Sequence, residues 1–208
     1  MEKKTRFSTL RLCELALLVA LELLMALTPL GYLQLPFISA SLISIPVAIG
    51  AILMGPLEST LLGLVFGLTS FVKGFTTTSL MTQAMYAASI PMSFVVAVIG
   101  RVLMGLCVGL LVQLVRKLTR NKDGIVSCIV GGIGAPMLNT FFYMGLLMLL
   151  FYRIDYIQNF AAKVGSLNPI VLIAAMVGTQ ALIEIGVCGF ISTVIGKTLL
   201  TVLNRKKK

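Results

Sequence analysis

The residues that could do chemistry are polar side chains set inside otherwise apolar stretches of the sequence. Charged and amide groups are costly within a bilayer, and those that occur there usually mark a binding site or a transport pathway. Three pairs of such residues are four positions apart, which places both members of a pair on one helix face. The pairs are Thr69 with Lys73, Asn139 with Tyr143, and Gln180 with Glu184.

Arg101 is the most informative of these polar residues. It lies sixteen residues before Lys117, and at about 1.5 Å per residue it should stand roughly 24 Å above the inner membrane surface. A guanidinium cannot lose its proton there, so we expect it to face a carboxylate or a water-filled cavity. The alternative is that it extends to the outer headgroups or pairs with Glu184.

Two of these pairs, Asn139 with Tyr143 and Gln180 with Glu184, should lie at middle to outer depth, level with Arg101. Three helices could then bring a cation, two amides, a phenol and a carboxylate to one pocket, with Thr69 and Lys73 at its rim. The alternatives are hydrogen bonds between helices only and, for Lys73, extension to the headgroups. Glu22 is left open: it either pairs with another helix or lines the cavity.

Several chemistries have little support. The chain has no histidine, its four cysteines form no CxxC pair, and no GxSxG, HExxH or Walker A motif is present. These absences argue against a disulfide framework, a zinc site, hydrolysis and ATP use by this chain. We therefore expect no enzymatic activity, no metal and no cofactor.

The elements that carry these residues are apolar runs long enough to cross a membrane. The composition is 58% hydrophobic and 12% charged, which exceeds the apolar content of a soluble domain. We predict an all-α membrane protein, a six-helix transmembrane bundle in one domain over residues 1–208. The runs are 10–30, 41–55, 57–73, 90–118, 124–152 and 169–203. The first run ends without a cleavage site, so we expect it to remain as a helix.

Charge predicts the orientation of this bundle. The net charge of +10 comes from basic residues in blocks beside the apolar runs, so topology explains it better than nucleic-acid binding. One side of the membrane would carry Lys3, Lys4, Arg6, Arg11, Arg116, Lys117, Arg120, Lys122, Arg205, Lys206, Lys207 and Lys208. The other side would carry Lys73, Arg153 and Lys163. Both termini are therefore expected in the cytoplasm, with the long connections 31–40, 74–89 and 153–168 forming a lid outside.

Small residues recur at four-residue spacing, which lets helices approach closely in lipid. The pairs are Ala16 with Ala20, Gly63 with Gly67, Ala84 with Ala88, Gly105 with Gly109, and Ala174 with Gly178. For any one pair, ordinary packing inside the bundle is the simplest interpretation.

Five segments together resemble a known family. They are LALLVALELLMA at 15–26, IPVAIGAILMGP at 45–56, LLGLVFGLTSFVKG at 61–74, PMLNTFFYMG at 136–145 and GTQALIE at 178–184. In order and spacing the chain resembles the S-components, the substrate-binding membrane subunits of energy-coupling factor (ECF) vitamin transporters. Within that family it is most similar to the pantothenate-type members.

The resemblance implies a function and partners. A vitamin, with pantothenate as the best candidate, would be captured with high affinity from outside a bacterial cell by this multi-pass protein. Delivery would use a transmembrane coupling subunit and two cytoplasmic ATPase subunits, with Ala16 and Ala20 facing the coupling subunit. Arg101 would grip the vitamin's carboxylate in a two-bond fork, and Asn139, Tyr143 and Gln180 would add neutral hydrogen bonds.

Other functions remain open at this point. The ligand could be folate, riboflavin or pyridoxine. The chain could also be a stand-alone proton-coupled transporter of a small organic acid, with Glu184 as proton carrier, or a non-transporting assembly factor. Copurification with a coupling subunit and two ATPases would favour the S-component, whereas uptake by the chain alone would favour the second possibility.

Overall fold

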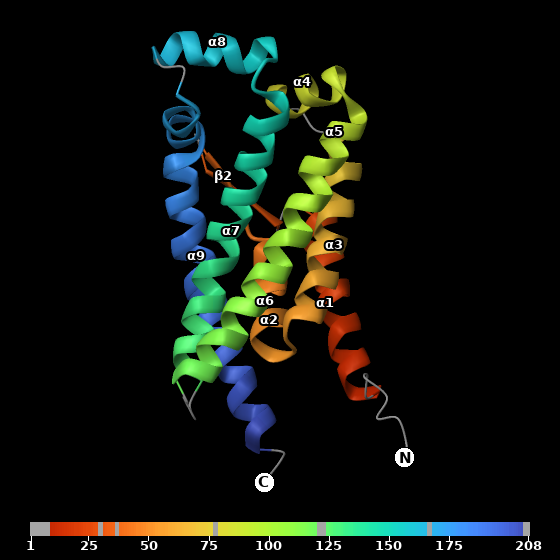
Figure 1. Ribbon diagram of the computed structural model, residues 1–208. Coiled ribbons are helices and arrows are strands. Elements are labelled where there is room, and N and C mark those ends of the chain that lie inside the picture. Colours follow the sequence, from red (N-terminus) through yellow and green to blue (C-terminus); the bar gives the residue numbers. More distant parts are fainter. Residues whose placement is uncertain are drawn as a thin grey trace.

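The long elements of the molecule are helices that run side by side in one bundle (Figure 1). The computed structural model describes residues 9–28, 31–35, 38–76, 79–119, 124–165 and 168–205. The lengthwise helices are α1 Thr9–Leu27, α2 Ser44–Leu53, α3 Pro56–Gly74, α6 Gly100–Thr119, α7 Ile125–Phe151 and α9 Pro169–Arg205. Short α5 (Ile90–Phe94) and the π-helix η2 (Val95–Ile99) lead directly into α6.

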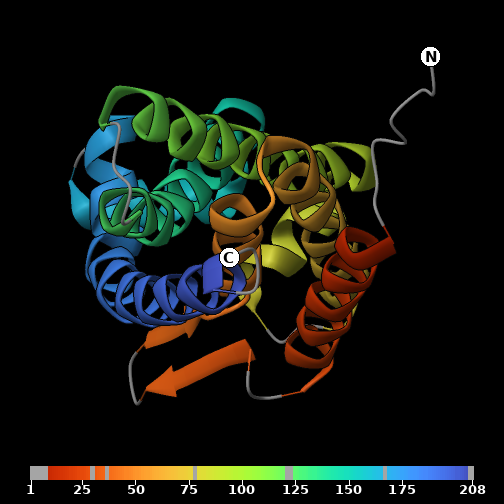
Figure 2. The same ribbon diagram turned by 90° about the horizontal axis from the view of Figure 1, so that it is seen from below.

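These helices agree closely with the apolar runs in the sequence. The run 57–73 is observed as Pro56–Gly74 and the run 124–152 as Ile125–Phe151. The first two runs are shorter than expected, because α1 ends at Leu27 and α2 covers only ten residues. Residues 44–52 of α2 are all buried, and α2 lies in the middle of the bundle in the view from below (Figure 2).

Length and apolarity identify three membrane-crossing helices among the described residues: Ile90–Thr119, Ile125–Phe151 and Ala181–Val202. A fourth would require joining Asp155–Val164 to Pro169–Gly178 across an 88° bend. The helix α1 carries Arg11, Glu14 and Glu22, and α2 is too short to cross a bilayer alone. The chain is thus an apolar helical protein, and the count of six spans stays a prediction.

The three long connections that were expected to form a lid contain structure that the sequence did not predict. The first holds the antiparallel strands β1 (Tyr32–Leu35) and β2 (Ile38–Ser41), with Tyr32 opposite Ser41. The other two connections contain α4 (Leu80–Ala88) and α8 (Asp155–Val164). Both short helices lie across one end of the bundle, whereas α1 begins and α9 ends at the other end (Figure 1).

Two of the small-residue pairs bring α3 into backbone contact with α6 and with the η2 segment that leads into it. A Cβ atom added at Gly63 would collide with the carbonyl oxygen of Arg101, and one added at Gly67 would lie 2.7 Å from the Cα of Val98. On the facing helix, a Cβ at Gly105 would collide with the carbonyl oxygen of Ser59. The predicted close approach is therefore confirmed here. For Ala174 and Gly178 it stays a prediction, since a Cβ added at Gly178 has no atom of the described residues within 4 Å.

The apolar core is divided into two clusters. The first joins α1, α2, α3, α6, α7 and α9 around residues such as Leu18, Ile52 and Phe66. The second joins α4, η2, α7, α8 and α9 around Met85, Leu147 and other buried side chains. Residues of both clusters, among them Phe66 and Met85, line one cavity together with polar side chains.

Candidate functional site

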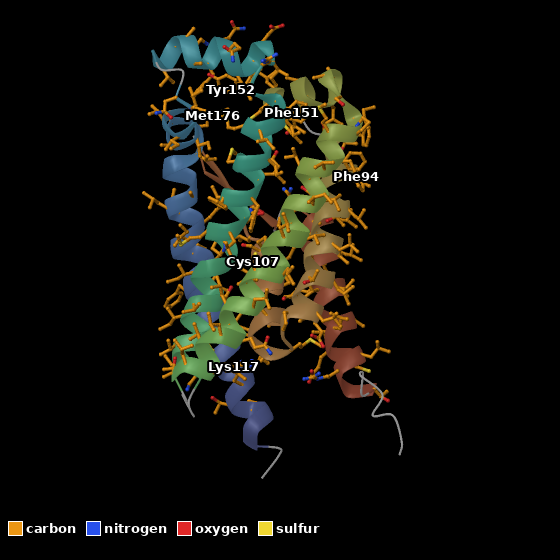
Figure 3. The ribbon with its side chains drawn as sticks, viewed as in Figure 1. Phe94, Cys107, Lys117, Phe151, Tyr152 and Met176 are labelled. Atoms are coloured by element: carbon orange, nitrogen blue, oxygen red, sulfur yellow. The ribbon has the colours of Figure 1, made fainter. Side chains whose placement is uncertain are left out.

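A cavity of about 750 Å³ lies among the helices, toward the end of the bundle that α4 and α8 cover. Its lining comes from α3, α4, α5, η2, α6, α7, α8 and α9, together with Ser41 at the end of β2. Met176, one of the lining residues, lies near the level of Phe151 and Tyr152, while Cys107 and Lys117 lie further toward the other end of the bundle (Figure 3). The cavity thus belongs to the end of the bundle that α4 and α8 cover.

Arg101 lines the cavity and is only 8% exposed. Its Nη1 donates a hydrogen bond to the carbonyl oxygen of Ala97 at 2.9 Å. The guanidinium carbon lies 4.7 Å from the centre of the Phe66 ring and 4.8 Å from that of Tyr143. Two aromatic rings therefore hold the cation by cation–π attraction at the wall of the cavity.

Glu184 also lines the cavity and is 4% exposed. Its Oε1 accepts a hydrogen bond from the backbone N–H of Ser41 at 2.7 Å. One turn later on α9, the Cys188 thiol donates to the carbonyl oxygen of Ser41 at 3.5 Å. Together these two side chains attach the end of the β-hairpin to α9, whose flank the hairpin follows in Figure 2.

Asn139 and Lys73 complete the set of predicted residues in the lining. Asn139 is half-buried, and its Oδ1 atom has no hydrogen-bond partner among the described residues. Lys73 donates from Nζ to the carbonyl oxygen of Ala26 in α1 at 2.9 Å. Asn139 therefore offers an acceptor that a ligand could satisfy.

Two predicted residues do not join this set. The Thr69 hydroxyl donates within its own helix, to the carbonyl oxygens of Val65 at 2.9 Å and Phe66 at 3.0 Å. Thr69 is not part of the cavity lining. Gln180 is a residue of α9 whose side chain lies outside the described part of the chain.

Much of the remaining wall was not predicted from the sequence. It contains four methionines, three aromatic residues of α4 and α8, and several hydroxyl groups: Met81, Met85, Met144, Met176, Tyr86, Tyr156, Phe160, Ser70, Thr82, Ser93 and Thr140. A usable signal for α8 was present, because Tyr156, Phe160 and Val164 are spaced four apart beside polar Asp155 and Lys163.

Tyr86 shows how α4 is fixed over the cavity. Its hydroxyl donates to the carbonyl oxygen of Phe71 at 2.7 Å, and its ring stacks on the Phe71 ring with centroids 5.6 Å apart. Burial, followed by the nearby Tyr143, raises the pKa of Tyr86, while Arg101 lowers it. The phenol therefore remains a hydrogen-bond donor at neutral pH.

The described lining has an excess of positive charge. It includes Lys73 and Arg101 as cations and Glu184 as the carboxylate.

The geometry is that of a ligand-binding cavity in a helical membrane protein, and a family comparison agrees with it. The family model described as "ECF transporter, substrate-specific component" matches residues 10–196. The chain belongs to this family. No curated protein matches the chain.

Membership gives the coarse function. S-components are membrane subunits that bind a small substrate and act together with a transmembrane coupling subunit and ATPases. They form a family of transport proteins and not of enzymes. The prediction of a substrate-binding transport subunit is confirmed at this level, and the cavity among the helices is its candidate substrate site.

Proposed function

We propose that this S-component binds a small carboxylate vitamin, with pantothenate as the best candidate, and delivers it to an ECF coupling module. The observation that carries the proposal is the Arg101 guanidinium held between Phe66 and Tyr143 at the wall of a cavity with a positive charge excess. A preformed cation in a partly desolvated site favours an anionic ligand and offers a planar fork to its carboxylate.

Neighbouring residues match the rest of such a ligand. Pantothenate carries hydroxyl groups and an amide besides its carboxylate. The Oδ1 atom of Asn139 can accept from one of those donors, and Thr140 and Ser93 add hydroxyl groups to the same lining. The methionines and aromatic residues of the outer wall can pack against the ligand's methyl groups.

The orientation belongs to the same proposal. We place six helices across the cytoplasmic membrane of a bacterium, with both termini inside and the cavity facing outward. The apolar runs and the clustering of basic residues support this placement. The arrangement in Figure 1 is compatible with it, because α1 begins and α9 ends at the end of the bundle opposite α4 and α8.

The coupling face is assigned to α1. Ala16 and Ala20 are both exposed, and larger side chains on the same helix, such as Leu17 at 70% and Leu27 at 82%, are exposed as well. A helix with an apolar exposed face and small residues four apart can be approached closely by another membrane helix. This supports docking of the coupling subunit on α1.

Titration calorimetry with pantothenate tests the ligand assignment. Removing a charge-assisted pair from a partly desolvated site costs about 2–5 kcal/mol, so Arg101→Gln should weaken binding roughly 30-fold or more. Arg101→Lys should recover part of the affinity, because an ammonium cannot form the fork. Thr69→Val is the matched control, since Thr69 lies on a neighbouring helix outside the lining.

Thermal stability measured in parallel separates the outcomes. If Arg101 only pairs with Glu184, changing both residues to Gln should restore stability and affinity together. Unchanged affinity in a well-folded Arg101→Gln protein would refute the carboxylate site. Absence of pantothenate binding to the wild type would refute the vitamin assignment and leave family membership standing.

A further inference from the structure

The positive charge at the C-terminal end of α1 comes from a residue of another helix. The last four carbonyl groups of a helix lack partners within it, and a positive charge near them is stabilising. The last turn of α1 contains no basic residue. Lys73 of α3 supplies one, because its Nζ donates to the carbonyl oxygen of Ala26 at 2.9 Å.

The same lysine is one of the residues that line the cavity. Arg101 is held by two rings and a carbonyl oxygen, whereas Lys73 carries its charge on a flexible four-carbon stem. Lys73 can therefore serve either the end of α1 or an anion in the cavity. A helix C-terminus presents about half an elementary charge, whereas a carboxylate presents a full one.

We propose that Lys73 transmits occupancy of the cavity to α1. An anionic ligand draws the ammonium away from the Ala26 carbonyl, and the outer end of α1 loses its terminal cation. The inference rests on the proposed function in one respect, namely that the ligand is an anion. It gives Lys73 a role beyond contact with the ligand.

A second contact determines what such a release would do. At the inner end, Arg11 of α1 lies 3.8 Å from the Glu58 carboxylate of α3. The two contacts join residue 11 to residue 58 and residue 26 to residue 73. Both pairs are separated by the same number of residues, so α1 and α3 run parallel to each other between the two contacts. Loosening only the outer contact leaves the inner one as a pivot. The exposed Ala16 and Ala20 lie between the two contacts, so their face would tilt.

Hydrogen exchange of the S-component in detergent tests this inference, with mass spectrometry of peptides covering residues 22–28. Lys73→Met removes the cation and keeps an apolar stem. Without ligand, these amides should exchange about 2- to 30-fold faster in the variant than in the wild type, as expected for loss of a charge at a helix end. Pantothenate should produce the faster exchange in the wild type and no further change in the variant.

Two controls limit the interpretation. Lys163→Met removes an exposed lysine of α8 that does not line the cavity, and it should exchange like the wild type. Peptides covering residues 11–15 should not change in any protein. Equal exchange at 22–28 in ligand-free wild type and Lys73→Met overturns the inference, as does calorimetrically verified pantothenate binding that leaves exchange unchanged. If pantothenate does not bind, the vitamin assignment fails separately. The comparison of ligand-free wild type with Lys73→Met then decides whether Lys73 stabilises the end of α1.

Discussion

Glu22 is a fully buried acid on α1, and neither carboxyl oxygen has a hydrogen-bond partner among the described residues. The sequence left two roles open for it, pairing with another helix or lining the cavity. It is not part of the cavity lining. Burying a polar group without a hydrogen bond is costly, so Glu22 is expected to lower the stability of the fold.

Replacing Glu22 should therefore stabilise the fold. Glu22→Met keeps a similar length and removes the unsatisfied oxygens, which should raise the free energy of unfolding by about 1–3 kcal/mol. Thermal unfolding in detergent measures the change. Glu14→Met on the same helix is the control, because Glu14 is only half-buried and should show a smaller effect. A lower melting temperature for Glu22→Met would mean that the carboxyl group has a stabilising partner.

For single residues, the sequence was informative where a polar side chain occurred within an apolar helix. Arg101, Asn139 and Glu184 stood out because charge and amide groups are rare in apolar helices, and the structure brings them to one cavity. Thr69 was grouped with Lys73 by spacing alone, and spacing cannot reveal that a hydroxyl bonds its own helix. The four methionines of the cavity lining could not be predicted from the sequence, because apolar residues are expected throughout a membrane protein.

Among the elements, α3 and α6 depend on glycine at their contact. Gly105→Leu places a side chain against the Ser59 backbone, and overpacking of this kind costs about 1–3 kcal/mol or more. Thermal unfolding should show a clear loss of stability. Gly145→Leu in α7 is the matched control, because a Cβ at Gly145 meets nothing within 4 Å. Equal stability of both variants would contradict the close α3–α6 packing.

The role of α1 can be separated from ligand binding. Ala16→Trp or Ala20→Trp should abolish uptake by the assembled transporter, because a bulky residue prevents close helix approach. Calorimetry on the isolated subunit should still show ligand binding. Ala162→Trp makes the same change on an exposed position of α8 and should leave uptake intact. Normal uptake in both α1 variants would refute the proposal that the coupling subunit docks on α1.

Helix positions were more predictable than the structure of the connections. Long apolar runs gave the helices within a few residues, as at Pro56–Gly74. The strands of the hairpin have four residues each. This length is too short to show the alternation of apolar and polar residues that predicts a strand. The helices α4 and α8 lie across the end of the bundle and combine apolar with polar faces, so a search for membrane-length runs passes over them.

For the whole molecule, the proposed orientation in the membrane can be measured by thiol labelling. A membrane-impermeant thiol reagent should label a cysteine placed at Asn159 from outside the cell, and one placed at Lys122 only after access to the inside. The reason is the clustering of basic residues on one side. The exposed Cys13 should be changed to serine in both proteins. Labelling from the opposite sides would reverse the proposed topology.

The distribution of aromatic residues gives the protein an optical property. The chain contains five tyrosines and no tryptophan, and Tyr86, Tyr143 and Tyr156 all line the cavity. Ultraviolet emission therefore comes from tyrosine alone, without energy transfer to an indole. A ligand entering among these three rings changes the surroundings of most of the emitters at once. Substrate capture should thus be measurable as a change in intrinsic fluorescence of the unlabelled protein, with no engineered probe.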